Sequence, residues 1–133
     1  VDTAIFNFAF VDLGVVPEAA SSYLLPQMVG QRRASELLML GERFDAQTAN
    51  HVGIVNQVVT ADELDSLAWS KAQQLASKPP QALRQTKMLL KRGNQQTVEE
   101  TISYELGIFA ERVQSDEARQ IMEAFLERST KKK

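Results

Sequence analysis

A series of helix start and stop signals constrains this sequence more than any other feature. The residues at 60–63 form a capping box, in which a threonine and a glutamate can satisfy each other's backbone donors. Two prolines at 79–80 break the chain and suit the start of another helix, a second capping box lies at 97–100, and Ser115 precedes two acidic residues. We therefore predict a row of helices after residue 60, the first of them ending near Ser77.

Shorter elements are expected in the first half. Pro17 suits the first position of a helix, which Pro26 should end or kink early. A second helix is predicted over 31–41, with three leucines directed inward, and Asp45 has the chemistry to cap a third helix that ends before Gly53. The inward leucines are Leu37, Leu38 and Leu40.

Two stretches read as strands. Residues 4–10 alternate and are rich in aromatic side chains, and residues 54–59 form a short apolar run. Neither stretch has an obvious partner in the sequence, and an unpaired strand leaves backbone groups unsatisfied. Val1 is not a methionine, and the opening reads like the interior of a strand region. We therefore expect the partner strands in a preceding part of a longer protein.

Composition narrows the classes of function. The 133 residues suffice for one small domain with a core, and the net charge of −2 gives no indication of nucleic acid or of an acidic membrane as a partner. The absence of cysteine excludes disulfides, cysteine nucleophiles and thiolate metal sites. No other pattern suits a metal, and no glycine-rich phosphate loop is present. We expect no metal, no nucleic acid and no membrane partner.

Four motifs of the first half and one near the end carry a resemblance to a known family. They are "LGVVP" (13–17), "LPQMVGQRRA" (25–34), "ELLMLG" (36–41), "FDAQTANHVGIVNQVV" (44–59) and "AFLER" (124–128). Together they resemble the C-terminal half of the enoyl-CoA hydratase/isomerase (crotonase) superfamily, over nearly the whole chain.

The resemblance implies an α/β crotonase-like fold, a spiral of strand–strand–helix units followed by a helical region that forms trimers. Residues 1–60 would be the C-terminal end of the spiral core, and residues 61–133 the helical oligomerisation region. The expected assembly is a homotrimer or a dimer of trimers, and this chain is expected to be mostly helical.

The position of one carboxylate separates the branches of the family. Hydratases resemble one another in using two glutamates, and the second of them matches Phe10 here, which can neither take nor give a proton. Glu18 stands where hydratases usually have glycine, and this arrangement resembles that of the enoyl-CoA delta isomerases. A single carboxylate can remove a proton from C2 and return one to C4. The resulting enolate needs preorganised donors, which the resemblance places before this chain.

An ordinary structural role for Glu18 is the alternative. A glutamate directly after Pro17 is a common helix start, where the carboxylate favours the positive end of the helix dipole. Such a position would lower the pKa of the carboxyl group, whereas an apolar pocket would raise it. From the resemblance we take Glu18 as the catalytic base.

The resemblance also implies residues that bind the substrate. Phe10, Leu13 and Val16 would line an acyl pocket, with core packing as the alternative. Phe125 and Arg128 match positions where an aromatic and a basic residue hold the adenine and phosphates of CoA, although the family usually has lysine at the second position. Packing of Phe125 within a helix and solvation of Arg128 are the alternatives.

The function implied is a shift of the double bond of an acyl-CoA from position 3 to position 2, in fatty-acid beta-oxidation. The CoA thioester is the substrate, and no cofactor is expected. A hydratase, a dienoyl-CoA isomerase, and a non-catalytic acyl-CoA-binding or assembly module are the alternatives. We expect the protein in a bacterial cytoplasm, or alternatively in mitochondria or peroxisomes, and we expect the 133 residues alone to be inactive.

Overall fold

The computed structural model of the protein describes residues 1–92 and 95–130, and most of them are helical. In chain order the elements are β1 (Ile5–Phe6), the 3₁₀ helix η1 (Val11–Leu13), α1 (Ser21–Val29), α2 (Gln31–Leu40), β2 (Phe44–Asp45), α3 (Ala46–His51), α4 (Ala61–Ala76), α5 (Pro80–Arg92), α6 (Gln95–Gln114) and α7 (Asp116–Thr130).

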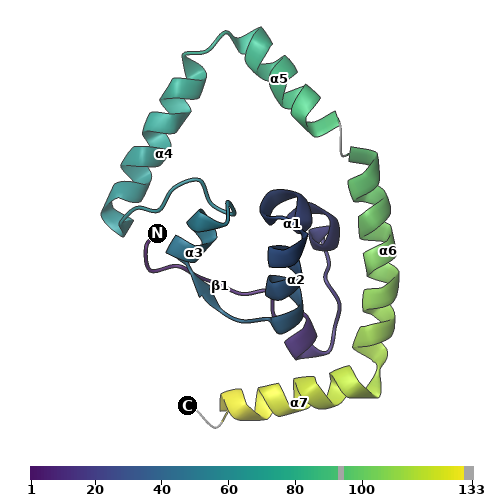
Figure 1. The fold of residues 1–133 in the computed structure, drawn as a ribbon. Helices are drawn as coiled ribbons and strands as arrows, with labels where there is room; N and C mark the ends of the chain where they lie inside the picture. Colours follow the sequence, from purple (N-terminus) through teal and green to yellow (C-terminus); the bar gives the residue numbers. More distant parts are fainter. Residues whose placement is uncertain (93–94, 131–133) are drawn as a thin grey trace.

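The helices form a centre and an arc. Helices α1, α2 and α3 lie in the middle, and α4 to α7 run around them as an open arc (Figure 1). Helix α6 packs on α1, and α7 packs on η1, so the end of the chain returns to its beginning. Within the described residues, no helix is both long and apolar enough to cross a membrane.

The core lies between α1 and α2. Leu25 of α1 and Ala34, Leu37 and Leu38 of α2 are buried together, as an amphipathic pair of helices requires. Partly buried side chains from the N-terminal segment, from the end of α1 and from the region after α2 cover this cluster; they are Phe8, Phe10, Val29, Phe44 and Ile54. Leu40 was predicted to point inward but is 58% exposed; it is the last residue of α2, beyond the buried Leu37 and Leu38.

The strand predictions were partly wrong. Only Ile5–Phe6 of the predicted 4–10 strand is extended, and it pairs antiparallel with Phe44–Asp45. The first strand therefore has a partner inside this chain. Residues 54–59 form no strand; residues 54–56 make bends, and Asp2 N donates a hydrogen bond to Val59 O at 2.8 Å.

Five of the predicted helix starts are confirmed. Gln31 and Pro80 begin α2 and α5, and the other three starts are capped by side chains. Asp45 caps α3 by accepting a hydrogen bond from Thr48 N at 2.8 Å. Thr60 and Glu63 form the capping box of α4, with Thr60 N donating to Glu63 Oε2 at 3.0 Å. Ser115 separates α6 from α7, and its Oγ accepts from the backbone N–H of the first turn of α7.

Other boundary predictions were wrong. Helix α1 begins at Ser21 and not at Pro17, and Pro26 lies inside it without ending it. Gly30 ends it instead, with a φ of 79°. The second capping box does not start a helix, because α6 already begins at Gln95 and Thr97 lies inside it.

Two of these caps make stability depend on pH. The pKa of Asp45 is lowered by the hydrogen bond from the Thr48 backbone, and the pKa of Glu63 is lowered by the side chain and backbone of Thr60. A carboxylate with a lowered folded-state pKa stabilises the fold above its unfolded pKa, and this contribution is lost as the pH falls through the folded value. For Asp45 the loss therefore begins near its ordinary pKa of 3.8.

We predict that the double variant Asp45→Asn, Glu63→Gln is less sensitive to acid than the wild type. Its amides keep cap acceptors but do not titrate in this range. The measurement is thermal unfolding of both proteins at about pH 7 and about pH 3. The wild type should have the higher midpoint at about pH 7, and the difference in midpoint between wild type and variant should be smaller at about pH 3. A difference that stays the same at both pH values would contradict the role of these two charges.

Candidate functional site

Glu18 lies in the loop that joins η1 to α1. Its side chain is exposed. Its backbone oxygen accepts two hydrogen bonds from Ser21, from N at 3.0 Å and from Oγ at 2.6 Å. The loop therefore bends back at Glu18 and presents the carboxylate outside the helix that follows. This position contradicts the helix-start reading of Glu18, because two residues separate it from the first turn of α1.

The two intervening residues have an unusual backbone. Ala19 and Ala20 both have positive φ, of 57° and 58°. L-residues with a side chain seldom adopt this left-handed conformation, since it brings Cβ close to the following carbonyl oxygen. Ala20 is fully buried. Two strained residues in succession persist only when surrounding contacts fix them, and such strain is concentrated at functional sites.

A buried carboxylate from α6 supplies these contacts. Glu105 is 5% exposed, and its Oε2 accepts a hydrogen bond from Ala20 N at 2.7 Å. Its Oε1 accepts from Ser22 N at 3.1 Å and also from Ser22 Oγ. The first backbone donors of a helix have no partner within it, so Glu105 satisfies donors that would otherwise be unpaired. Glu105 is not among the site residues predicted from the sequence.

Contacts with α6 and α7 also fix the other end of the loop. Arg112 Nε donates to Gly14 O at 3.1 Å, and the Arg112 guanidinium pairs with Glu117. Gly14 has a φ of 73°, and a Cβ there would lie 3.0 Å from Ala118 Cα. The Glu18 loop is thus held at both ends by the C-terminal helices.

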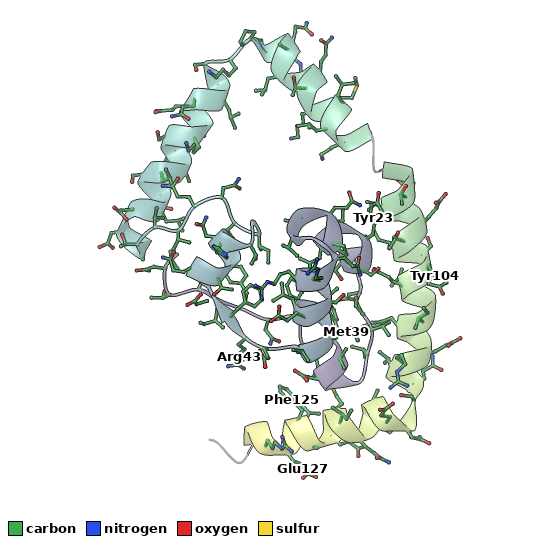
Figure 2. All side chains as sticks on the ribbon, in the orientation of Figure 1. Tyr23, Met39, Arg43, Tyr104, Phe125 and Glu127 are labelled. Carbon is green, nitrogen blue, oxygen red and sulfur yellow. The ribbon has the colours of Figure 1, made fainter. Side chains whose placement is uncertain are left out.

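Three of the predicted substrate-binding residues lie together. Leu13 of η1 and Phe125 and Arg128 of α7 line one cavity of about 180 Å³. Figure 2 labels Phe125 on the part of α7 that lies below η1. Asp12, Ile121 and Ala124 complete the cavity. An aromatic ring and a guanidinium at its rim offer a stacking surface and a charge for an anion.

The other two predicted residues lie elsewhere. Phe10 is partly buried and packs on the core cluster, as the packing alternative expected. Val16 is partly buried in the loop before Glu18. The structure does not place either of them in the cavity with Leu13.

A second cavity adjoins the Glu18 loop. It has a volume of about 240 Å³ and is lined by Pro17, the residue before Glu18, and by side chains of α1 and α2. Most of its lining is apolar; besides Pro17 it includes Val11, Ser22, Pro26, Gln31, Ala34, Ser35, Leu38 and Met39. An apolar hollow of this kind can take part of an acyl chain.

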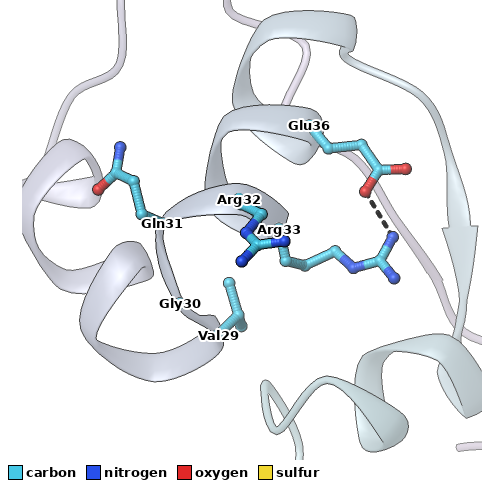
Figure 3. A pocket seen from close by; sticks show the side chains of 6 residues that line it. All are labelled: Val29, Gly30, Gln31, Arg32, Arg33 and Glu36. Atoms are coloured by element: carbon cyan, nitrogen blue, oxygen red, sulfur yellow. Dashed lines mark hydrogen bonds and ion pairs between the residues drawn. The ribbon is translucent and has the colours of Figure 1, made fainter.

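A third hollow, of about 440 Å³, lies at the start of α2 (Figure 3). Arg32 and Arg33 line it, and Arg33 forms an ion pair with Glu36 at 2.6 Å. Both arginines are exposed, so this ion pair is a surface contact that contributes little to stability. Among the described residues, no cluster of histidine, aspartate and glutamate could hold a metal ion.

The sequence did contain a signal for Glu105. In a helical repeat, residue 105 falls between Ile102 and Phe109, on the apolar face of α6. A charged side chain on a buried face needs a partner, because burying an unpaired charge is costly. The sequence could therefore have indicated that Glu105 has a partner, but not which one.

Comparisons with known proteins find relatives from one family. The sequence model of a family described as enoyl-CoA hydratase/isomerase matches residues 1–132. Enoyl-CoA delta isomerase 2 of Rattus norvegicus is 29% identical over 130 residues, which are 98% of this chain and 33% of that protein. A probable enoyl-CoA hydratase of Mycobacterium bovis is 30% identical over 127 residues, 96% of this chain and 49% of that protein.

A solved structure shares the fold. The crystal structure of an enoyl-CoA hydratase/isomerase from Pseudoalteromonas atlantica matches with a TM-score of 0.91 and 38% identity, over 96% of this chain and 51% of that one. This chain spans between one third and about half of the length of these relatives.

Proposed function

Since this chain belongs to the enoyl-CoA hydratase/isomerase family, we propose that the complete protein moves the double bond of an enoyl-CoA thioester from position 3 to position 2. In this proposal Glu18 is the single acid–base. It removes a proton from C2, and the enolate of the thioester forms. The same carboxyl group then returns a proton to C4.

The observation that carries the proposal is the setting of Glu18. Glu18 stands on a loop held at both ends, and its neighbour Pro17 lines a largely apolar cavity of about 240 Å³. A base on a fixed loop near an apolar hollow suits proton transfer along an acyl chain. Phe10 supports an isomerase over a hydratase, because its ring cannot supply the second carboxylate of a hydratase.

The substrate-binding roles are part of the proposal. Phe125 and Arg128 would hold the CoA part, with the ring of Phe125 against the adenine and the guanidinium of Arg128 on a phosphate. Leu13, which the resemblance placed in the acyl pocket, lines the same cavity. Donors for the enolate oxygen would come from a segment that precedes this chain.

Product analysis with the complete protein tests the function. We expect a 3-enoyl-CoA to be converted to the 2-enoyl-CoA, and a 2-enoyl-CoA to remain unhydrated. Formation of 3-hydroxyacyl-CoA from the 2-enoyl-CoA, without isomerisation, would instead support the hydratase. Turnover confined to substrates with two double bonds would support the dienoyl-CoA isomerase.

Assembly is a second candidate function, for the helical part at 61–133. Several large apolar side chains of α4 and α5 are exposed; Trp69 is 71% and Leu90 is 76% exposed. Exposed apolar surface of this kind marks an interaction surface, and copies of the same chain in a trimer would bury it. Light scattering after size exclusion tests this, and a well-folded monomer would count against it.

A further inference from the structure

We propose that Glu105 of α6 is the positioning residue for the base at Glu18, an inference that rests on the proposed function. Glu105 does not reach the reacting atoms itself. It acts through the backbone of Ala20 and Ser22, whose N–H groups it binds just after Glu18. The helical C-terminal part of the chain thereby sets the direction of the catalytic carboxylate.

The contacts of Glu105 are specific for this loop. Its described hydrogen bonds all go to the start of α1, from residues that lie 83 and 85 positions away in the sequence. Both carboxylate oxygens are used, and one of them accepts two of the three bonds. A carboxylate that accepts two backbone N–H bonds fixes two peptide planes at once.

The loop needs such an anchor. Ala19 and Ala20 have a left-handed backbone, which is unfavourable for an L-residue with a side chain. Without the acceptor at Glu105, the N–H groups of Ala20 and Ser22 would lack partners near the core. The two alanines would then relax toward negative φ, and this rotation would displace Glu18. A displacement of about 1 Å can lower a rate by about 10²-fold.

The test is Glu105→Gln in the complete protein. The amide has the same size, but it places N–H donors where a second acceptor is needed. We expect kcat to fall by about tenfold to a hundredfold, with KM within about twofold of the wild-type value. Glu111→Gln makes the same change on the exposed face of α6 and should leave both parameters unchanged.

A second readout separates positioning from loss of folded protein. Circular dichroism gives the folded fraction at the assay temperature, and amide hydrogen exchange gives local opening. If Glu105 positions the loop, the Glu105→Gln variant should remain folded, and its amide hydrogens should exchange faster in a segment that contains Ala20 and Ser22. A kcat within about twofold of wild type would overturn the inference. So would a fall matched by the lost folded fraction, with faster exchange throughout the chain.

Glu18→Gln, assayed in parallel, keeps the two proposals distinguishable. If Glu18→Gln loses isomerisation and Glu105→Gln does not, only the positioning inference fails. If Glu18→Gln turns over like the wild type, the proposed function fails and the positioning of a base fails with it. In that case the exchange data still show whether Glu105 holds the loop.

Discussion

Replacement of Glu18 with glutamine is expected to lower the rate of 3-enoyl-CoA isomerisation by about 10²- to 10⁴-fold, the usual contribution of a positioned acid–base. The amide has nearly the same shape but cannot accept the proton from C2. Because the Glu18 side chain is exposed in the structure and makes no described contact with the core, the fold should be unaffected. The measurement is a coupled assay of the complete protein.

Two further variants sharpen this prediction. Glu18→Asp keeps the carboxylate but withdraws it by one methylene, so its rate should lie between those of the wild type and Glu18→Gln. Glu42→Gln changes an exposed glutamate outside the site and should have no effect. Undiminished turnover in Glu18→Gln would remove Glu18 from the mechanism.

Gly14→Ala is expected to lower the free energy of unfolding by about 2–5 kcal/mol. The left-handed φ of 73° costs roughly 1–2 kcal/mol with a side chain. The new Cβ would lie 3.0 Å from the backbone of Ala118 and 3.1 Å from Ile121, and such overpacking costs about 1–3 kcal/mol more. Denaturant unfolding measures the loss.

Gly107→Ala is the matched control for this variant. Gly107 lies within α6, and a Cβ there would meet nothing within 4 Å. Alanine in a helix interior is favoured over glycine by roughly 0.5–1 kcal/mol, so this variant should be slightly more stable than the wild type. Equal stability of the Gly14→Ala and Gly107→Ala variants would contradict the close contact between Gly14 and α7.

The fold was predicted largely through the resemblance. The crotonase-like class is confirmed by the solved structure with a TM-score of 0.91. Local signals located α3, α4 and α7 because Asp45, Thr60 and Ser115 cap them by contacts within a few residues. Local signals failed at Pro17, where tertiary contacts hold the chain in a loop and delay the helix to Ser21.

The grouping of the site residues was not predictable from the sequence. Phe125 and Arg128 share a cavity, as neighbouring turns of one helix allow, but Leu13 joins them there, away from Phe10 and Val16, with which the resemblance had placed it. The anchor at Glu105 was not predicted, since its partners lie more than 80 residues away and nothing in the local sequence names them. The physical reason for Gly14 in the "LG" motif also appears only once α7 packs against it.

A crystal structure of the complete protein with a bound 3-enoyl-CoA analogue tests the central claim most directly. The proposal predicts that a carboxylate oxygen of Glu18 lies within about 3.5 Å of both C2 and C4, the reach that proton transfer requires. It also predicts that Glu105 still binds Ala20 and Ser22. A Glu18 side chain directed into solvent, with the acyl chain beyond its reach, would contradict the account.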